Sequence, residues 1–224
     1  MRYLIFGAEG HIGRAITAKL HDEGHYVIVC PRGINPTLRG NMMDAVWDVS
    51  DRNEMARYAE IYKKRNHLDG IIYAVGHCPP NGFVDATKFP LSKLPLAIYE
   101  KEIEMHQLGV LNVFQLMLSH VEVGGCFLFL LSAITRMKGK FPPNIHADYH
   151  ASVIAAEDWL IDGMRHDPAV QKRNIKIHRL APAAVDTPFH HGGLKLPRFI
   201  PISDVANEAV LALESTKHID KQIQ

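Results

Sequence analysis

The chain has 224 residues, 47% of them hydrophobic, and its 25 Lys and Arg residues nearly balance its 24 Asp and Glu residues. This length predicts one large domain over residues 1–224, which buries roughly 70% of its unfolded surface without help from disulfides or metals. The charge balance argues against a nucleic-acid-binding domain, which carries a basic excess, and against an acidic disordered chain.

Strand-like and helix-like segments alternate along the chain. Short apolar runs predict strands buried on both faces, and apolar residues spaced three and four apart predict helices. This alternation favours right-handed βαβ units, and therefore an α/β fold with a Rossmann-like, doubly wound parallel sheet in a three-layer α/β/α sandwich. The predicted strands are 3–6, 26–30, 45–49, 69–75, 126–131, 175–180 and the edge strand 219–223, and the predicted helices are 12–23, 53–66, 95–121, 147–164 and 203–214.

The segment 7–13 (GAEGHIG) lies between the first predicted strand and the first predicted helix. Ligands of parallel sheets bind beyond the carboxyl ends of the strands, where glycines allow a tight turn and let backbone N–H groups approach a pyrophosphate. This position favours dinucleotide binding over a tight turn without a ligand. The residues expected to contact the cofactor here are Gly7, Glu9, Gly10, His11, Ile12 and Gly13.

The end of the second predicted strand bears on the choice of cofactor. An acidic residue there would bind the ribose 2′-OH of NAD, but the chain has Pro31 and Arg32. The Arg32 guanidinium could bind a 2′-phosphate through two hydrogen bonds, which favours NADP(H) over NAD(H). Two alternatives stay open: Glu9 lies in the same neighbourhood and argues for NAD(H), and Arg32 could be a solvated loop charge.

Further segments resemble motifs of the short-chain dehydrogenase/reductase family, in the family's order and with plausible spacing. They are 47–51 (WDVSD), 74–76 (AVG), 125–132 (GCFLFLLS), 149–152 (YHAS) and 181–188 (APAAVDTP). The resemblance runs over nearly the whole chain and implies a dinucleotide-binding oxidoreductase. It adds as expected cofactor contacts Asp48, Val49, Ala74, Val75, Gly76, Pro182, Val185 and Thr187.

The resemblance also implies catalytic residues. Tyr149 matches the family's general acid or base, and Ser132 matches the serine that binds the substrate carbonyl. Val153 replaces the lysine that binds the ribose and lowers the pKa of the tyrosine. His106 replaces the asparagine of the proton relay, where it is either a relay group or an ordinary helix histidine. With an unperturbed pKa of ~10, Tyr149 is expected to donate a proton but to be a poor base.

The expected function is therefore reduction of a small-molecule carbonyl with NADP(H) or NAD(H). The lost lysine leaves a second hypothesis, a catalytically impaired relative that binds a dinucleotide as a sensor or as a subunit of a complex. Lys138 or Lys140 could supply the missing charge. The family further implies a short substrate lid at 186–200 and a homodimer or homotetramer formed through the helices at 95–121 and 147–164.

The chain contains 14 histidines, which raises the question of a metal site. The pair His146 and His150 lacks an H-E-x-x-H motif, and His190 and His191 are adjacent, so no metal is predicted. Half of the histidines lie on segments that the resemblance places around cofactor and substrate, and they predict an active-site rim whose charge changes between about pH 6 and 8. These are His11, His77, His106, His146, His150, His190 and His191.

Localisation follows from the apolar runs and the cysteines. No run of ~18 apolar residues predicts a membrane-spanning helix, and the N-terminal apolar run is too short for a secretory signal. Cys30, Cys78 and Cys126 are far apart and lack a C-x-x-C spacing, so they are expected to be buried, reduced thiols. We therefore expect a cytoplasmic protein that binds neither nucleic acid nor membranes.

Overall fold

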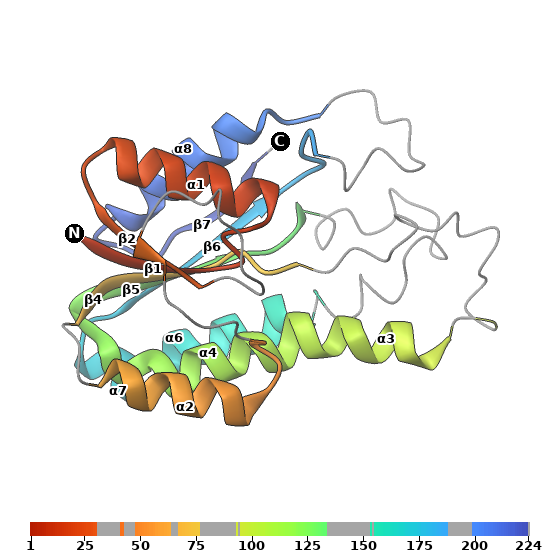
Figure 1. The fold of residues 1–224 in the computed structure, drawn as a ribbon, viewed down its shortest axis with the longest axis horizontal. Coiled ribbons are helices and arrows are strands. Elements are labelled where there is room, and N and C mark those ends of the chain that lie inside the picture. The colour runs from red at the N-terminus through yellow and green to blue at the C-terminus, as the bar shows by residue number, and fades with distance from the viewer. Residues whose placement is uncertain are drawn as a thin grey trace.

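The computed structural model of the chain describes residues 1–30, 41–42, 48–63, 67–76, 93, 95–133, 153, 155–187 and 199–223. Within these residues, seven parallel strands form one sheet in the order β3-β2-β1-β4-β5-β6-β7 (Figure 1). The strands are β1 (Arg2–Phe6), β2 (Tyr26–Cys30), β3 (Asn41–Met42), β4 (Leu68–Tyr73), β5 (Val121–Leu130), β6 (Lys176–Pro182) and β7 (Asp220–Ile223).

Helices cover both faces of the sheet (Figure 1). One face carries α1 (His11–Asp22) and α8 (Ile202–Leu213). The other face carries α2 (Arg52–Tyr62), α4 (Gly109–Met117), α6 (Asp162–His166) and α7 (Pro168–Lys172). This three-layer arrangement confirms the predicted Rossmann-like, doubly wound α/β fold. None of the helices in the described part of the chain is both long and apolar enough to cross a membrane.

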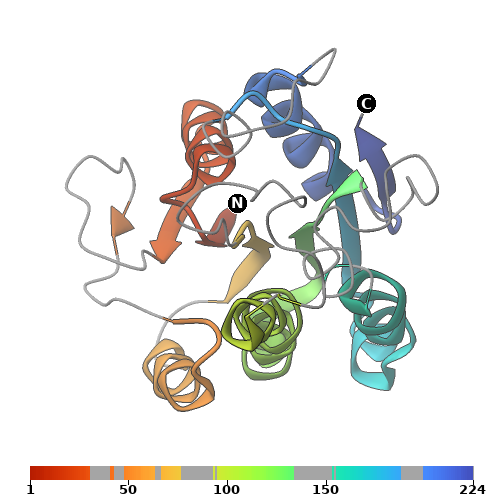
Figure 2. The ribbon, with the colours of Figure 1, turned by 90° about the vertical axis from the view of Figure 1, so that its right-hand side faces the viewer.

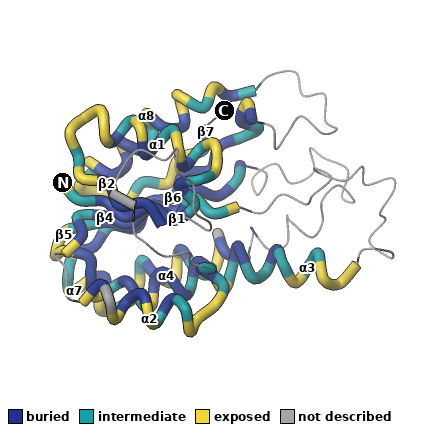
Figure 3. The backbone as a smooth tube through the Cα atoms, in the orientation of Figure 1, coloured by how far each residue is buried: buried dark blue, intermediate teal, exposed yellow. Residues whose placement is uncertain are grey.

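Each face of the sheet has its own hydrophobic cluster. Leu4 and Phe6 of β1 belong to the cluster that includes residues of α2 and α4, whereas Tyr3 and Ile5 belong to the cluster that includes residues of α1 and α8. Successive side chains alternate between the faces, and all four are buried because helices cover both (Figure 3). A strand buried on both sides is apolar at every position, which is why the sequence shows uninterrupted apolar runs.

The third strand differs from the prediction. The sequence predicts it at 45–49, but β3 is Asn41–Met42, and Asp48 and Val49 lie in a turn outside the sheet. Residues 45–47 lie outside the described residues. Val49 is apolar because it packs beside α4, where its Cγ2 atom lies 2.9 Å from the position that a Cβ on Gly109 would take. Val49 is therefore a buried turn residue and not a strand residue.

Both long predicted helices contain a π-helical turn. The helix predicted at 95–121 consists of α3 (Leu96–Ile103), the π-helical turn η2 (Glu104–Leu108), α4 and the 3-10 turn η3 (Leu118–His120). In the segment predicted at 147–164, the π-helical turn η5 (Ala156–Ile161) precedes α6. Residues 147–152 lie outside the described residues.

The short helix α7 was not predicted, although its start has a recognisable sequence. The Asp167 carboxylate accepts hydrogen bonds from the N–H groups of Ala169 and Val170, and Pro168 occupies the first helical position. Arg173, directly after the helix, donates from its guanidinium to the carbonyl oxygens of Leu118 (2.6 Å) and Val121. These bonds satisfy carbonyl groups at the first residue of η3 and the first residue of β5.

Two of the cysteines can be located. Cys30 and Cys126 are buried and form no disulfide, as the sequence predicts, and Cys78 lies outside the described residues.

Candidate active site

The segments singled out by the sequence follow the carboxyl ends of neighbouring parallel strands. Gly7 follows β1, Ala74 follows β4, Ser132 lies two residues after β5, and Ala183 follows β6. Figure 2 looks onto this edge of the sheet. Because parallel strands end at the same edge, these four segments lie around one region, as in other open α/β sheets that bind ligands.

The turn after β1 requires glycine at two positions. Gly7 has a φ of +81°, and a Cβ on it would lie 2.5 Å from the carbonyl oxygen of Ala74. A Cβ on Gly13 would lie 2.2 Å from the carbonyl oxygen of Gly7. The N–H of Gly10 donates to that same oxygen at 3.1 Å and closes the turn. No other residue fits at positions 7 and 13 without moving the backbone.

The N-terminus of α1 is suited to an anion. Gly10 is its N-cap residue and has no side chain to cap it, and no acidic residue lies in the first helical turn. His11 is exposed, Ile12 and Glu9 are half-buried, and Ile12 packs against the cluster under α1 and α8. The first N–H groups of a helix lack partners within the helix, so they attract phosphate groups. The turn therefore fits the pyrophosphate of a dinucleotide.

Asp48 lies in a turn that α2 and α4 hold in place. Its carboxylate accepts hydrogen bonds from the N–H and the hydroxyl of Ser50, at 2.9 and 2.5 Å. Its own N–H donates to Glu54 Oε2 at 3.1 Å. From α4, Asn112 Nδ2 donates to the carbonyl oxygen of Val49 at 3.1 Å. The positions of Asp48 and Val49 are thus fixed from both sides.

The end of β4 is joined to the π-helical turn η2. The Tyr73 hydroxyl donates to the carbonyl oxygen of Met105, and burial, followed by the charge of Asp48, raises the pKa of Tyr73. A Cβ on Gly109 would lie 2.5 Å from the Tyr73 hydroxyl, so only glycine lets the helix approach this closely. His106, the next residue after Met105, is therefore near the carboxyl end of β4.

His106 forms a buried pair with Glu102 of α3. Its Nε2 atom lies 3.1 Å from Glu102 Oε2, and the two side chains are 6% and 1% exposed. A carboxylate next to one ring nitrogen fixes the orientation of the imidazole. Glu102 is not among the site residues predicted from the sequence, although its i, i+4 spacing from His106 in a predicted helix indicates that the two side chains are neighbours.

The position that the sequence resemblance assigns to the family's lysine is part of the hydrophobic core. Val153 is 0% exposed and belongs to the same cluster as Phe129 and Leu131. A lysine at this position would place its ammonium group in apolar surroundings, which is costly without a charged partner. Ser132 follows Leu131, which belongs to this cluster, and its side chain is half-buried.

The segment after β6 is fixed at its base. Val185 forms a parallel bridge with Ile200, whose N–H donates to the carbonyl oxygen of Ala184 at 2.8 Å. The Thr187 hydroxyl is buried and donates to the carbonyl oxygen of Val185 at 3.5 Å. Pro182 ends β6 beside Ile223 of β7. The two ends of the predicted lid, 186–200, are therefore side by side.

Several predicted site residues cannot be placed. Arg32 and Tyr149 lie outside the described residues, so their roles stay predictions. The same holds for Lys138 and Lys140, and for His77, His146, His150, His190 and His191.

Two other histidines serve the fold. His178 Nδ1 accepts the N–H of Ile219 at 3.2 Å, and His218 Nδ1 accepts the N–H of Ile177 at 3.0 Å. Burial, followed by the nearby charges of His218 and Arg165, lowers the pKa of His178 to about 4. Both imidazoles accept hydrogen bonds through Nδ1 and join β6 to the segment that leads into β7, which accounts for part of the high histidine count without metal or catalysis.

Comparisons with known proteins agree with this geometry. The sequence model of the family described as short chain dehydrogenase matches residues 2–193. A short-chain dehydrogenase/reductase from Serratia marcescens superimposes with a TM-score of 0.78 at 17% identity, covering 99% of this chain and 96% of that chain. A short-chain type dehydrogenase/reductase from Mycobacterium ulcerans gives 0.76 at 17% identity, covering 99% and 88%.

A third similar structure was solved with a cofactor. It is a short chain dehydrogenase from Burkholderia cenocepacia in complex with NADP, with a TM-score of 0.73 at 18% identity, covering 98% of this chain and 87% of that chain. At such identities the structural likeness shows the fold. No curated protein sequence matches the chain.

Proposed function

The chain belongs to the short-chain dehydrogenase/reductase family, and from this premise we propose that it reduces a small-molecule carbonyl with a nicotinamide dinucleotide. The observation that carries the proposal is the glycine turn. Gly7 approaches the end of β4, and Gly13 approaches Gly7, too closely for any side chain. The turn thereby presents bare backbone N–H groups at the N-terminus of α1, as a bound pyrophosphate requires.

NADP(H) is the proposed cofactor, with NAD(H) as the alternative. Arg32 follows β2 where NAD-binding relatives would need an acid, and the similar Burkholderia protein was solved with NADP. Glu9 in the glycine turn is the argument for NAD(H). The proposed contacts with the pyrophosphate region are Gly7, Glu9, Gly10, His11, Ile12 and Gly13. The adenosine half is expected to contact Arg32, Asp48 and Val49. The rest of the cofactor is expected to contact Ala74, Val75, Gly76, Pro182, Val185 and Thr187.

The bound cofactor would supply the hydride that reduces the carbonyl carbon. In our proposal the Ser132 hydroxyl donates a hydrogen bond to the carbonyl oxygen, and the Tyr149 hydroxyl donates its proton to the same oxygen. His106, oriented by Glu102, returns a proton to Tyr149. Because Val153 carries no charge, Tyr149 keeps its proton at neutral pH, which suits reduction better than alcohol oxidation.

The second candidate is a non-catalytic dinucleotide-binding protein that acts as a sensor or as a subunit of a complex. It is favoured by one observation, the complete burial of Val153 in the hydrophobic cluster. The surroundings of Val153 are apolar and disfavour the charge that the family's mechanism uses at this position. The Ser132 and Tyr149 pair favours the enzyme, since a protein without catalysis has no need of both.

The test measures cofactor binding and turnover separately. NADPH and NADH are titrated by nicotinamide fluorescence, and reduction of a panel of small aldehydes and ketones is followed by loss of NADPH absorbance. We expect tighter binding of NADPH, and loss of reduction in Tyr149→Phe with unchanged cofactor binding. Tyr26→Phe, at the opposite end of the sheet, is the matched control.

Two results would change the proposal. Full turnover in Tyr149→Phe would remove Tyr149 from the mechanism. Tight NADPH binding without turnover of any carbonyl in the parent protein would favour the non-catalytic candidate.

The proposal also includes an assembly and a location. Trp159 of η5 is 80% exposed and Leu108 of η2 is 46% exposed, and the two π-helical turns are in contact. An apolar surface of this kind is typical of a subunit interface, so we propose a homodimer or homotetramer formed through the helical segments predicted at 95–121 and 147–164, which contain η2 and η5. We also propose a cytoplasmic location.

A further inference from the structure

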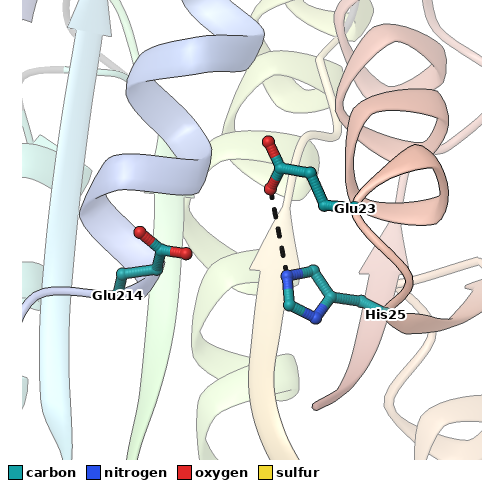
Figure 4. Close-up of side chains that lie close together, drawn as sticks. All are labelled: Glu23, His25 and Glu214. Atoms are coloured by element: carbon teal, nitrogen blue, oxygen red, sulfur yellow. Dashed lines mark ion pairs between the residues drawn. The ribbon is translucent and has the colours of Figure 1, made fainter.

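Three potential metal ligands lie close together beyond the amino ends of the strands, at the opposite end of the sheet from the candidate active site. Glu23 is the C-cap residue of α1, His25 directly precedes β2, and Glu214 is the C-cap residue of α8. One ligand atom from each residue lies within 4.8 Å of those of the other two. Figure 4 shows the two carboxylates and the imidazole around a common space.

The end of α1 holds Glu23 and His25 in fixed positions. Gly24 has a φ of +81° and donates its N–H to the carbonyl oxygen of His21 at 2.9 Å. The N–H of His25 donates to the carbonyl oxygen of Leu20 at 3.0 Å, which completes a Schellman motif. The His25 side chain is 16% exposed, and its ring lies edge-on to Tyr3 with 5.4 Å between centroids. The imidazole is therefore oriented by the fold itself.

Packing of α8 along α1 brings Glu214 to this place from the far end of the chain (Figure 1). Both helices cover the same face of the sheet, and both end at the same edge. The N–H of Glu214 donates to the carbonyl oxygen of Val210 at 3.2 Å, so its backbone still belongs to the last turn of α8. The three ligands thus come from packed, regular elements.

Electrostatics at this edge favour a cation. The C-terminus of a helix carries a partial negative charge, and acidic residues there are normally unfavourable. Here two helices end together, each with a Glu at its cap. Lys19 Nζ contacts Glu23 Oε1 at 2.8 Å, but Oε2 of the same carboxylate faces His25.

We propose that Glu23, His25 and Glu214 bind a divalent transition-metal ion, with Zn²⁺ as the representative. The distance of 3.9 Å between His25 Nε2 and Glu23 Oε2 is too long for a hydrogen bond. Two ligands of a tetrahedral zinc ion are about 3.4 Å apart, so small movements of the two exposed carboxylates would close the site. One nitrogen and two carboxylate donors suit zinc better than Mg²⁺, which prefers oxygen ligands.

The proposed ion has a structural role that is independent of the proposed function. It would fasten the C-terminus of α1 to that of α8, while the glycine turn lies at the other end of α1. This set of ligands matches no sequence motif, because Glu23 and His25 are two residues apart and Glu214 is distant in sequence. Such ligands become visible only when the packing of α1 against α8 is known.

The test uses the full chain, freed of metal by a chelator, with Zn²⁺ alone as the probe. Zinc affinity is measured by calorimetry, and the thermal midpoint is compared with and without zinc for each variant. We expect zinc to raise the midpoint of the parent protein. Loss of a supporting partner typically weakens metal binding 10–100-fold, so losing a ligand in His25→Asn or Glu214→Gln should weaken it at least about tenfold.

The matched controls are His21→Asn on α1 and Glu122→Gln on β5, which are exposed residues outside the cluster. They should keep the parent's zinc affinity and thermal shift. Because each variant is compared with itself with and without zinc, a general loss of stability cannot imitate loss of the site. The proposal is overturned if the parent binds no zinc, if Mg²⁺ binds as tightly, or if His25→Asn and Glu214→Gln bind zinc like the controls.

Discussion

Gly7 and Gly124 have the same left-handed backbone, each with a φ of +81°, but different surroundings. A Cβ on Gly7 would lie 2.5 Å from the carbonyl oxygen of Ala74, whereas nothing lies within 4 Å of a Cβ on Gly124. The two glycines therefore separate two reasons for this residue type, the left-handed backbone conformation and the close approach of the segment that follows β4. Only the second reason is tied to the shape of the candidate active site.

We predict that Gly124→Ala lowers the free energy of unfolding by about 1–2 kcal/mol, the cost of a left-handed backbone for a residue with a Cβ. Gly7→Ala should cost about 3 kcal/mol, because the contact with β4 adds an overpacking penalty, and it should weaken NADPH binding. Urea unfolding and nicotinamide fluorescence measure both effects. Equal losses in the two variants would show that the approach to Ala74 does not restrict position 7.

For single residues, the sequence predicts those roles that depend only on neighbouring residues in the chain. The requirement for Gly7 and Gly13 follows from a strand, a turn and a helix that are adjacent in sequence. Glu214 beside His25, by contrast, depends on packing between distant elements, and no local pattern contains that information. The proposed preference for NADP(H) rests on Arg32, and the proposed proton donor is Tyr149; both residues lie outside the described residues.

The π-helical turns η2 and η5 are features of the helices that the sequence pattern does not predict. Apolar spacing correctly predicts helices at 95–121 and over the later part of 147–164, but it does not reveal a turn with one extra residue. The extra residue in η2 accompanies the bond from Tyr73 to Met105 and the close contact at Gly109. Such π-helical turns often occur at functional sites, and η2 contains His106, the proposed relay residue.

We predict that Glu102→Leu lowers the free energy of unfolding by about 3 kcal/mol, because it leaves the His106 imidazole buried without its carboxylate partner. The double variant Glu102→Leu/His106→Leu should recover most of this loss, since it leaves neither group unpaired. Urea unfolding of the parent, both single variants and the double variant gives the coupling energy. If the two single losses simply add, the buried pair contributes no coupling.

For the whole molecule, the fold was predictable because each βαβ unit repeats the same alternation of an apolar run and a helix. The order of strands follows from right-handed crossovers, and the site follows from where the strands end. The predicted position of the third strand was wrong, because a two-residue edge strand has too few residues to show an apolar pattern. Assembly depends on the exposed surface of the helices rather than on the fold.

We predict that the protein is a homodimer or homotetramer and that Trp159→Glu shifts it towards the monomer. A charge in the centre of an apolar interface is costly when it loses water, and Trp159 is 80% exposed in the single chain. Light scattering coupled to gel filtration measures the mass. Leu211→Glu, at a 60% exposed residue of α8 on the other helical layer, is the control and should leave the mass unchanged. A monomeric parent protein would contradict the prediction.

The strand order β3-β2-β1-β4-β5-β6-β7 also determines how the sheet can grow during synthesis on the ribosome. The strands β2 and β3 extend it outward from β1 on one side, and the strands from β4 to β7 then extend it on the other. Every newly made strand therefore joins an open edge of the sheet already present. No pair of strands has to separate to admit a later one, so the nascent chain can build its sheet in the order in which it is translated.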